Sequence, residues 1–368
     1  MIKININGPI LGTSGYDSHT RSLANALYKV ADVRLTTQFP NPDWNKMVND
    51  AELDMVTKKE RVDDYNILVS MPHMWKLFMG TGKNIGYCVW EGDKVPESWI
   101  EEFLNPKIHM IFVPSEHTKK AIEETLQCCY FHNADEVLDK IKVIPHGVDK
   151  SVFNNEDLKK NDGVFRFICN KGWRGTGWDR GGVQYLIKAF AEEFSKDEKV
   201  QLIVKLNPAY IQPQIVEQSI QNLNLQSDRA QIHINCSIIP FNKLKDLYNQ
   251  ADCFVCCTRS EAFNLPGLEA MSCELPTIQT NFGGQTDYMS PDNSLLIDYN
   301  LENVKEDLMY EEIQWATPKI ESIKKQLRWA FENQEKIKEM GKQAEIDSNN
   351  FTWDLSAQKI ITILSKNA

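Results

Sequence analysis

The stretch DCFVCCTRSEAFNLPGLEAMSCELPTIQT, from Asp252 to Thr280, contains a complete strand–helix–strand pattern. DCFVCC and LPTIQT are short apolar runs bounded by turn residues, which indicates two strands, and the segment from Pro266 to Cys273 is expected to form a helix. Two strands joined by a helix pair in parallel. The elbow before the helix carries Glu261, and Glu269 follows within the helix.

The same alternation of strands and helices runs along the whole chain. Strands are expected at residues 2–6, 32–38, 66–72, 84–91, 108–115 and 141–148, and again at 165–169, 200–206, 230–236, 252–257 and 275–280. Helices are expected at residues 18–30, 115–127, 183–194, 212–222, 242–249, 266–273, 323–345 and 352–364. Interleaved strands and helices imply parallel sheets covered on both faces. The predicted fold class is therefore α/β, with two Rossmann-like doubly wound sheets.

The chain is long enough for two domains. It has 368 residues, against roughly 150 residues for an average domain. The polar segment from Asn154 to Gly163 interrupts the alternation and has the composition of a linker. The sequence therefore predicts a first domain over residues 1–155 and a second over residues 161–348. Ligands of such sheets bind at the carboxyl ends of the strands, so function is expected in the loops there.

Composition excludes several classes of protein. The apolar fraction of 42% and the charged fraction of 25% are typical of a folded globular protein. No apolar run approaches the roughly 20 residues that cross a bilayer, and MIKININGPI lacks the apolar core of a signal peptide, so a cytoplasmic location is expected. The net charge of −10 argues against nucleic-acid binding. The nine cysteines suit a reducing compartment as free thiols, and no matching Cys or His pair turns DCFVCC into a metal site.

The elbow after the strand at residues 252–257 has the features of an anion site. Pro266 suits the first turn of a helix, so the amides of Phe263, Asn264, Leu265 and Gly267 lie at or just before a helix N-terminus, which attracts a phosphate. A carboxylate repels a phosphate but accepts two hydrogen bonds from a vicinal diol. Glu261 and Glu269 would then bind hydroxyls on either side of a phosphate, as in a nucleoside diphosphate sugar. Alternatively, Glu269 only complements the helix dipole and Glu261 is solvated.

The segment EAFNLPGLEAMSCELPTIQTNFGGQTDYM, residues 261–289, resembles the signature of retaining nucleotide-sugar glycosyltransferases with the two-domain GT-B fold, in the family four group. The resemblance implies that Glu261 contacts the transferred sugar. It implies further that the amides of Phe263, Asn264 and Leu265 hold the sugar and diphosphate and that Glu269 binds the ribose hydroxyls.

Further motifs, in the family's order, cover most of the chain: GPILGTSGYDSHTRSLANAL, YCVWEGDKVPESW, IFVPSEHTKKAI, VIPHGVD and FTWDLSAQKI. The resemblance implies that the terminal helix at 352–368 packs back on the first domain and that the loop with Gly12, Thr13, Ser14 and Gly15 approaches the donor diphosphate. Glycines there suit close backbone approach, and their spacing is not that of a dinucleotide-binding fingerprint. His73, Trp90 and Glu91 are candidate contacts of a sugar or acceptor.

One position departs from the family's pattern. The leaving diphosphate needs cations beside it, and the family supplies a lysine in an Arg-Lys-Gly triplet, where this chain has Arg180 followed by Gly181. Lys171, Arg174 and Lys205 are alternatives for the missing charge. We favour Arg180 with Lys205, which predicts that Lys205→Ala lowers turnover by on the order of a hundredfold.

The predicted function is a metal-independent retaining glycosyltransferase that moves a hexose from a nucleoside diphosphate sugar to a glycan, glycolipid or protein-glycan acceptor. No Asp-x-Asp triplet occurs to cage a divalent ion, so no cofactor is expected. Retention follows from the resemblance. Two alternatives stay open: a phosphorylase or epimerase on the same scaffold, and a catalytically impaired sugar-nucleotide-binding module, prompted by Gly181. The base, the sugar, the acceptor and peripheral membrane contact are left open by the sequence.

Overall fold

The computed structural model describes residues 1–38, 48–129, 132–156, 158–175, 179–208, 210–305 and 308–366. The chain divides into two compact units, one made of Met1–Gly147 with Phe351–Ala368 and the other of Val148–Asn350. The polar segment expected to be a linker, residues 154–163, therefore lies inside the second unit. Its start is held there because the side-chain amide of Asn249 donates to the carbonyl of Asn154 and accepts from the amide of Glu156.

The first unit is built on a parallel six-stranded sheet in the order β2-β1-β3-β4-β5-β6. The strands are β1 Lys3–Gly8, β2 Asp32–Thr37, β3 Tyr65–Val69, β4 Lys83–Tyr87, β5 Ile108–Val113 and β6 Ile141–Val143. The helices are α1 Gly15–Tyr28, α2 Asp50–Thr57, α3 Ile100–Leu104, α4 Glu116–Cys128, α5 Ala134–Lys140 and α12 Trp353–Lys366, with short 3₁₀ helices η2 Pro72–Leu77 and η3 Glu97–Trp99. Every residue of β3 is buried, as expected for a central strand covered on both faces.

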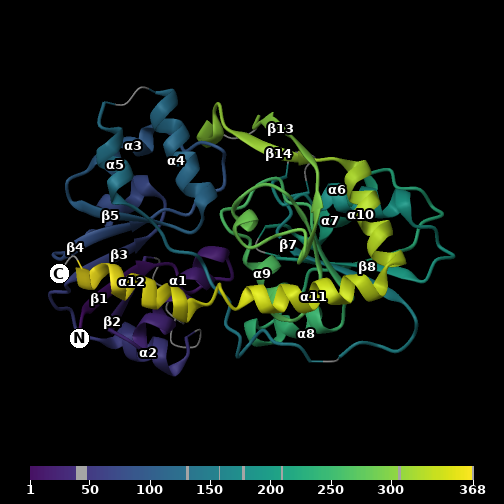
Figure 1. Cartoon of the computed structure of the whole chain (residues 1–368), viewed down its shortest axis with the longest axis horizontal. Coiled ribbons are helices and arrows are strands. Elements are labelled where there is room, and N and C mark those ends of the chain that lie inside the picture. The colour runs from purple at the N-terminus through teal and green to yellow at the C-terminus, as the bar shows by residue number, and fades with distance from the viewer. Residues whose placement is uncertain are drawn as a thin grey trace. The chain divides into compact units, whose positions relative to one another are not determined.

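The C-terminal helix α12 belongs to the first unit, although it lies about 200 residues further along the chain than β6 in sequence. It packs against α1 (Figure 1). The hydroxyl of Tyr65 donates to the carbonyl of Leu364 at 3.0 Å, and the hydroxyl of Ser356 donates to the carbonyl of Pro145 at 2.6 Å. These bonds attach both ends of α12 to the sheet and to the segment after β6.

The second unit repeats the arrangement with a parallel sheet in the order β12-β11-β10-β7-β8-β9. Its strands are β7 Phe165–Lys171, β8 Val200–Leu206, β9 Gln231–Asn235, β10 Cys253–Cys256, β11 Thr277–Thr280 and β12 Ser294–Ile297. Its helices are α6 Val183–Glu193, α7 Pro213–Gln221, α8 Leu244–Asn249, α9 Leu265–Ser272, α10 Ile320–Glu332 and α11 Gln334–Ser348. Short 3₁₀ helices occur at η4 Phe241–Lys243, η5 Gly284–Asp287 and η6 Leu308–Tyr310.

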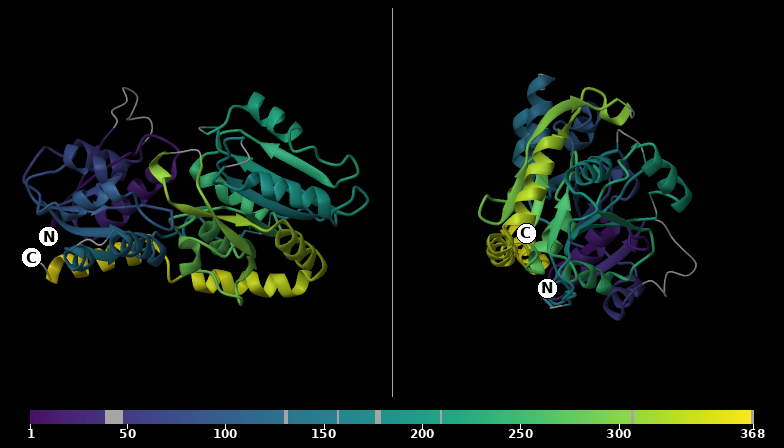
Figure 2. Two further views of the ribbon diagram at one scale, coloured as in Figure 1. Left: turned by 90° about the horizontal axis from the view of Figure 1, so that it is seen from above. Right: turned by 90° about the vertical axis from the view of Figure 1, so that its right-hand side faces the viewer.

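The helices of the second unit lie on both sides of its strands (Figure 2). The predicted α/β class with two doubly wound parallel sheets is thus confirmed. An antiparallel pair, β13 Tyr299–Asn303 with β14 Gln314–Pro318, was not expected, and the predicted helical region at 323–345 is two helices separated at Asn333. Phe165, Phe167, Phe190 and Phe194 pack edge-on or tilted in the core.

All nine cysteines are free thiols, as expected. Among the described residues, no helix combines the length and the apolar character needed to cross a membrane.

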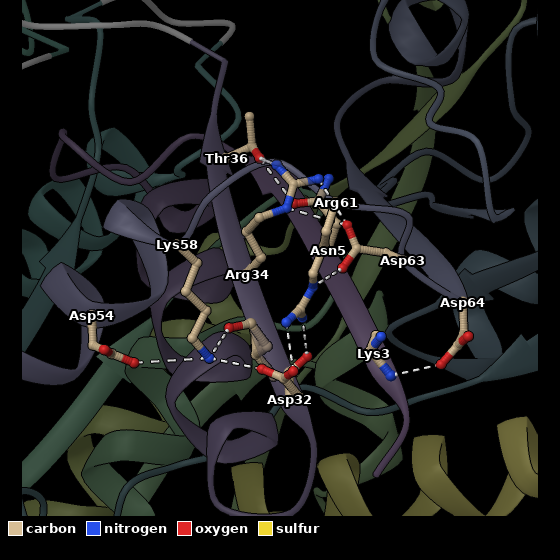
Figure 3. Close-up of polar contacts among 11 residues, drawn as sticks. Lys3, Asn5, Asp32, Arg34, Thr36, Asp54, Lys58, Arg61, Asp63 and Asp64 are labelled. Carbon is tan, nitrogen blue, oxygen red and sulfur yellow. Dashed lines mark hydrogen bonds and ion pairs between the residues drawn. The ribbon is translucent and has the colours of Figure 1, made fainter.

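A network of charged side chains joins the ends of β1, β2 and β3 in the first unit (Figure 3). The carboxylate of Asp63, only 1% exposed, accepts from Arg34 at 2.8 Å through one oxygen and from Arg61 at 2.9 Å through the other. Arg61 also pairs with Asp32, the first residue of β2. Since Asp63 precedes β3, its carboxylate ties β2 to the start of β3.

Asp63→Ala is therefore expected to lower the free energy of unfolding of the first unit by about 3 kcal/mol, because it leaves two partly buried guanidinium groups without their shared partner. Asp64→Ala is the matched control, because the exposed carboxylate of Asp64 accepts, among the described residues, the backbone amide of Lys3 alone. Urea denaturation of both variants measures the difference. Equal losses for the two variants would contradict a structural role for the buried network.

Candidate active site

The candidate site of the second unit lies where its sheet reverses direction. The chain runs from β7 outward through β8 to β9 and then returns to the other side of β7 as β10. At such a reversal the loops after the two adjacent strands diverge and leave a crevice for ligands at their carboxyl ends. Lys171 is the last residue of β7, and Glu261 follows β10. The strand order therefore brings these two side chains to one place.

Glu261 is held by two cations and a hydroxyl. Its Oε1 lies 2.7 Å from Nζ of Lys171 and 3.7 Å from Nη1 of Arg180, and it accepts from the hydroxyl of Thr258 at 3.3 Å. The side chain of Lys171 is 8% exposed and that of Glu261 15% exposed, whereas that of Arg180 is 38% exposed. The arrangement combines a nearly buried ion pair with a second cation that reaches solvent.

The protonation states of this pair follow from their mutual contact. Burial by itself raises the pKa of Glu261, but Lys171 and Arg180 lower it by more, so the pKa lies below its ordinary value. Burial likewise opposes the charge on Lys171, but Cys256 and Glu261 raise its pKa above the ordinary value. At neutral pH the site therefore holds a carboxylate beside an ammonium group.

Asn264 forms the elbow between β10 and α9. Its backbone is left-handed, with φ of +66°, and its side-chain oxygen accepts from Nζ of Lys171 at 3.1 Å. Its side-chain amide donates to Oε1 of Gln279 at 2.7 Å, and its carbonyl accepts from the hydroxyl of Tyr288 at 2.9 Å. Through these hydrogen bonds Asn264 connects the start of α9 to Gln279 of β11 and to Lys171.

Phe263 and Leu265 flank Asn264, as expected from the sequence. Phe263 is buried against the ring of Tyr288, and Leu265 is half-buried at the first position of α9. The amide of Gly267, which we expected to face an anion, instead donates to the carbonyl of Asn264. Because that amide is bonded within the first turn of α9, the backbone amides expected to hold an anion are reduced to those of residues 263–265.

Two glycines outside the predicted set shape the same elbow. The amide of Gly284 donates to the carbonyl of Glu261 at 2.7 Å, and a Cβ at Gly284 would lie 1.8 Å from the carbonyl oxygen of Ala262. Gly283 has φ of +94°, which favours glycine. Gly283 and Gly284 therefore allow the backbone after β11 to lie directly against the backbone of Glu261 and Ala262, which holds the elbow in place.

Glu269 lies one turn into α9 and is buried. The hydroxyl of Tyr248 donates to its Oε2 at 2.8 Å and accepts in turn from the side-chain amide of Asn170 at 2.9 Å. Burial raises the pKa of Glu269 from its ordinary value near 4.5 to about 7, although the bond from Tyr248 opposes this. Nothing in the sequence pattern pointed to Tyr248, since it stands at the end of α8 without a motif.

The other two candidate cations of the second unit, Lys205 and Arg174, make their contacts away from Glu261. Nζ of Lys205 donates to the carbonyl of Leu206 at 2.6 Å, and burial lowers the pKa of Lys205. Lys205 pairs with Asn170 across β7 and β8, so both side chains leave the sheet from the same face. Arg174 is exposed, and its backbone amide donates to the carboxylate of Asp179. The structure thus brings Lys171 and Arg180, rather than Lys205 or Arg174, to Glu261.

The predicted glycine loop lies in the first unit between β1 and α1. Ser14 caps α1, and the carboxylate of Asp17 accepts from the amides of Gly12 and Ser14 at 2.7 and 3.2 Å. Thr13 and Gly15 are exposed at the tip of this turn, and a Cβ at Gly15 would have no neighbour within 4 Å. The loop is therefore fixed by a capping box between Ser14 and Asp17, and α1 begins three residues before the helix expected at residues 18–30.

His73, Trp90 and Glu91 also belong to the first unit. His73 is exposed on η2, with its ring centroid 6.2 Å from that of Trp99. Trp90 is 1% exposed and its indole donates to the carbonyl of Lys94 at 2.6 Å. The carbonyl of the half-buried Glu91 contacts Nε2 of His117 at 2.8 Å. These positions favour a packing role for Trp90 and leave His73 accessible to a ligand.

Comparison with protein families identifies the segment that carries this site. Residues 179–347 match the family described as glycosyl transferases group 1. The matched segment includes Arg180, Glu261 and Glu269, and it begins eight residues after Lys171. No curated protein matches the sequence of the chain.

Solved structures similar to this chain cover both of its units. A glycosyltransferase from Rickettsia africae aligns with a TM-score of 0.72 at 16% identity, over 99% of this chain and 98% of that one. Sucrose-phosphate synthase from Thermosynechococcus elongatus aligns with a TM-score of 0.67 at 14% identity, over 100% and 99%. HepE from Anabaena, in complex with UDP-glucose, aligns with a TM-score of 0.68 at 14% identity, over the full length of both chains. The chain therefore has the GT-B fold.

The raised pKa of Glu269 predicts a pH dependence for the stability of the second unit. Between pH 4.5 and about 7 the folded domain keeps a proton on Glu269 that the unfolded chain has lost, so the free energy of unfolding falls as pH rises through this interval. At roughly 1.4 kcal/mol per pKa unit, the loss amounts to about 3 kcal/mol. Glu269→Gln is expected to abolish this part of the pH dependence.

Urea denaturation at pH 5 and pH 7.5 measures this effect in the wild type and in Glu269→Gln. Glu335→Gln is the control, because the side chain of Glu335 is 89% exposed on α11. A Glu269→Gln variant with the same pH dependence as the wild type would show that Glu269 ionises normally in the folded domain.

Proposed function

We propose that the chain is a retaining hexosyltransferase, which transfers a hexose from a nucleoside diphosphate sugar to a hydroxyl group of a carbohydrate or glycoconjugate acceptor. The contact of Glu261 with Lys171 and Arg180, at the N-terminus of α9, carries this proposal. It joins a carboxylate that can accept sugar hydroxyls to cations that can stabilise a leaving diphosphate. The match of residues 179–347 to the group 1 family supports it.

Each residue of the site has a part in the proposed reaction. Glu261 accepts hydrogen bonds from hydroxyls of the transferred hexose, and the backbone at residues 263–265 holds the diphosphate at the N-terminus of α9. Glu269 accepts the ribose hydroxyls once it is ionised, while Tyr248 keeps its carboxyl oriented. Because Lys171 and Arg180 supply the positive charge, the proposed reaction needs no divalent ion.

In the chemical step, the bond between the anomeric carbon and the diphosphate oxygen breaks, and the acceptor oxygen forms a bond to the same face of that carbon. The proton of the acceptor hydroxyl passes to the departing phosphate. Lys171 and Arg180 stabilise the negative charge that develops on the diphosphate. Retention of configuration follows from attack and departure on one face.

The compartment and the base of the donor complete the proposal. Nine free thiols are typical of a protein kept in a reducing compartment, which supports a cytosolic location. The complex of Anabaena HepE with UDP-glucose makes UDP-sugars the first donors to test.

Incubation of the chain with labelled UDP-, GDP- and ADP-hexoses tests the function. Slow release of the nucleoside diphosphate from one donor, persisting in excess EDTA and strongly reduced in Glu261→Gln, is the expected result. Binding of a donor without turnover would favour the impaired binding module, and absence of binding would overturn the proposal.

A further inference from the structure

The antiparallel hairpin of β13 and β14 forms a sheet of its own in the second unit, and β14 bonds to the loop after β10. The backbone amide of Ala316 on β14 donates to the carbonyl of Arg259 at 2.9 Å. Nε of Arg259 donates in return to the carbonyl of Ala316 at 3.0 Å. Arg259 lies two residues before Glu261. The hairpin is therefore bonded directly to the segment that carries Glu261.

The side chain of Arg259 is fully buried, at 0% exposed, and it is held by groups of both strands of the hairpin. Its Nη2 donates to the hydroxyl of Thr317 at 3.0 Å and lies 3.6 Å from Oε2 of Glu302 on β13. Its Cζ lies 5.7 Å from the centre of the ring of Trp315. A buried charge costs free energy unless it is paired and hydrogen-bonded, so these contacts keep the hairpin and the loop together.

The same loop holds Arg180 at two points. The backbone amide of Arg259 donates to the carbonyl of Arg180 at 2.8 Å. Nη1 of Arg180 donates to the carbonyl of Ser260, the residue next to Arg259, at 3.1 Å. Both the backbone and the guanidinium of Arg180 are thus bonded to the two residues that precede Glu261.

A second contact joins the hairpin to the loop after β11. The ring of Tyr299, the first residue of β13, lies 5.3 Å from the ring of Phe282, measured between centroids. Phe282 directly precedes Gly283 and Gly284, whose backbone lies against that of Glu261. The hairpin therefore contacts both of the loops that set the position of Glu261.

Arg180 depends on this support because its side chain is 38% exposed. Holding a long, partly exposed side chain in one rotamer costs conformational entropy, and hydrogen bonds to a fixed loop offset that cost. Nη1 of Arg180 lies 3.7 Å from Oε1 of Glu261. A displacement of the loop would therefore separate these two groups.

We propose that Arg259 is a positioning residue of the candidate active site, which binds the loop after β10 to the hairpin and so holds Arg180 beside Glu261. Arg259 acts through Arg180, because its own side chain is buried against the hairpin. The inference deepens the proposed function and rests on it wherever turnover is the readout.

A double-mutant cycle of Arg259→Met and Arg180→Met tests this role. Its readout is the single-turnover release of nucleoside diphosphate, at saturating concentration of whichever UDP-, GDP- or ADP-hexose the wild type turns over. We expect Arg259→Met to lower the rate at least about tenfold in the wild type but less than about threefold in Arg180→Met. A purely structural role lowers the rate by the same factor in both backgrounds, and that result would overturn the proposal.

Arg328→Met is the matched control for loss of a structural arginine. Arg328, on α10, also pairs with two carboxylates, those of Glu193 and Glu198, and its Cζ lies 4.5 Å from the ring centre of Phe194. We expect Arg328→Met to lower the melting temperature but to change the rate less than about threefold. Equal rate losses in Arg328→Met and Arg259→Met would show that lost stability explains both.

Two milder variants keep the test valid if Arg259→Met does not fold. Arg259→Lys retains a buried cation that donates to fewer groups, and it is expected to be at least about threefold faster than Arg259→Met. Thr317→Val removes one acceptor of the guanidinium and is expected to lower the rate about threefold in the wild type and not at all in Arg180→Met. Equal losses for Thr317→Val in both backgrounds would contradict the role of Arg259.

Crystal structures of the wild type and of Arg259→Met or Thr317→Val give a readout that needs no donor. In the variant, Nη1 of Arg180 is expected to lie more than about 6 Å from Oε1 of Glu261, beyond strong interaction between opposite charges. An unchanged contact would overturn the role of Arg259 and leave the proposed function intact. A wild type that turns over no donor would overturn the proposed function, whereas the crystal structures would still decide the role of Arg259.

Discussion

Lys171→Met is expected to lower the rate of sugar transfer at least about a hundredfold, which is the size of effect seen when a group that stabilises developing charge is removed. Nζ of Lys171 lies 2.7 Å from Glu261 and 3.1 Å from the side-chain oxygen of Asn264. The substitution removes a cation at the N-terminus of α9 and leaves the nearly buried Glu261 with the hydroxyl of Thr258 and the more distant Arg180. The pKa of Glu261 should then rise, which weakens its hold on sugar hydroxyls as well.

Lys205→Met is the matched control for this prediction. Both lysines stand near the carboxyl ends of adjacent strands and both are largely buried, but Nζ of Lys205 donates to the carbonyl of Leu206. We expect Lys205→Met to change the rate less than about tenfold. Single-turnover rates at saturating donor, with melting temperatures as a check on folding, measure both variants. A hundredfold loss in Lys205→Met with little change in Lys171→Met would restore the interpretation from sequence and overturn the role of Lys171.

Gly181→Lys, which introduces the lysine that the resemblance led us to expect at this position, is expected to lower both stability and turnover instead of raising activity. The amide of Gly181 donates to Oδ1 of Asp179 at 2.7 Å. A Cβ at this position would lie 2.1 Å from the carbonyl oxygen of Gly172 and 2.9 Å from Oδ1 of Asp179. No side chain fits there unless the loop moves, and overpacking of this kind costs about 1–3 kcal/mol.

The loop cannot move freely, because the next residue is equally confined. Gly182 has φ of +71°, and a Cβ on it would lie 1.7 Å from the carbonyl oxygen of Cys257. Displacing this loop would carry Arg180 away from Glu261, so we expect a loss of turnover of at least about tenfold in Gly181→Lys.

Gly181→Ala and Gly15→Ala test whether the loss expected in Gly181→Lys comes from the added Cβ or from the added charge. Gly181→Ala adds the same Cβ without the charge and should lower the melting temperature by several degrees, whereas a Cβ at Gly15 has open space and should not. Melting temperatures of the three variants check this. Increased turnover in Gly181→Lys would show that the site lacks a cation, which contradicts the assignment of Lys171.

The sequence predicted the elements of the candidate site that depend on local pattern. Alternating strands and helices placed β10, α9 and β11 within two residues of their observed bounds. The two glutamates fell where expected, one before α9 and one inside it. The left-handed Asn264 and the glycines at 283 and 284 were harder to predict, because their conformations follow from contacts between loops that are distant in sequence.

By itself, then, the sequence determined the α/β class, the two parallel sheets and the elbow between Glu261 and Glu269, because strand and helix periods and turn residues act over a few neighbours. Only the tertiary structure decided which cation meets Glu261. Lys171 is the last residue of β7 and Lys205 the last but one of β8, and local pattern does not show which of them meets Glu261. The sheet order places β7 directly beside β10 and β8 one strand further, a step of about 4.8 Å. The register adds to this, because Lys205 pairs with Asn170 and so leaves the sheet on the face opposite to Lys171. Lys171 therefore meets Glu261, whereas Lys205 donates to the carbonyl of Leu206.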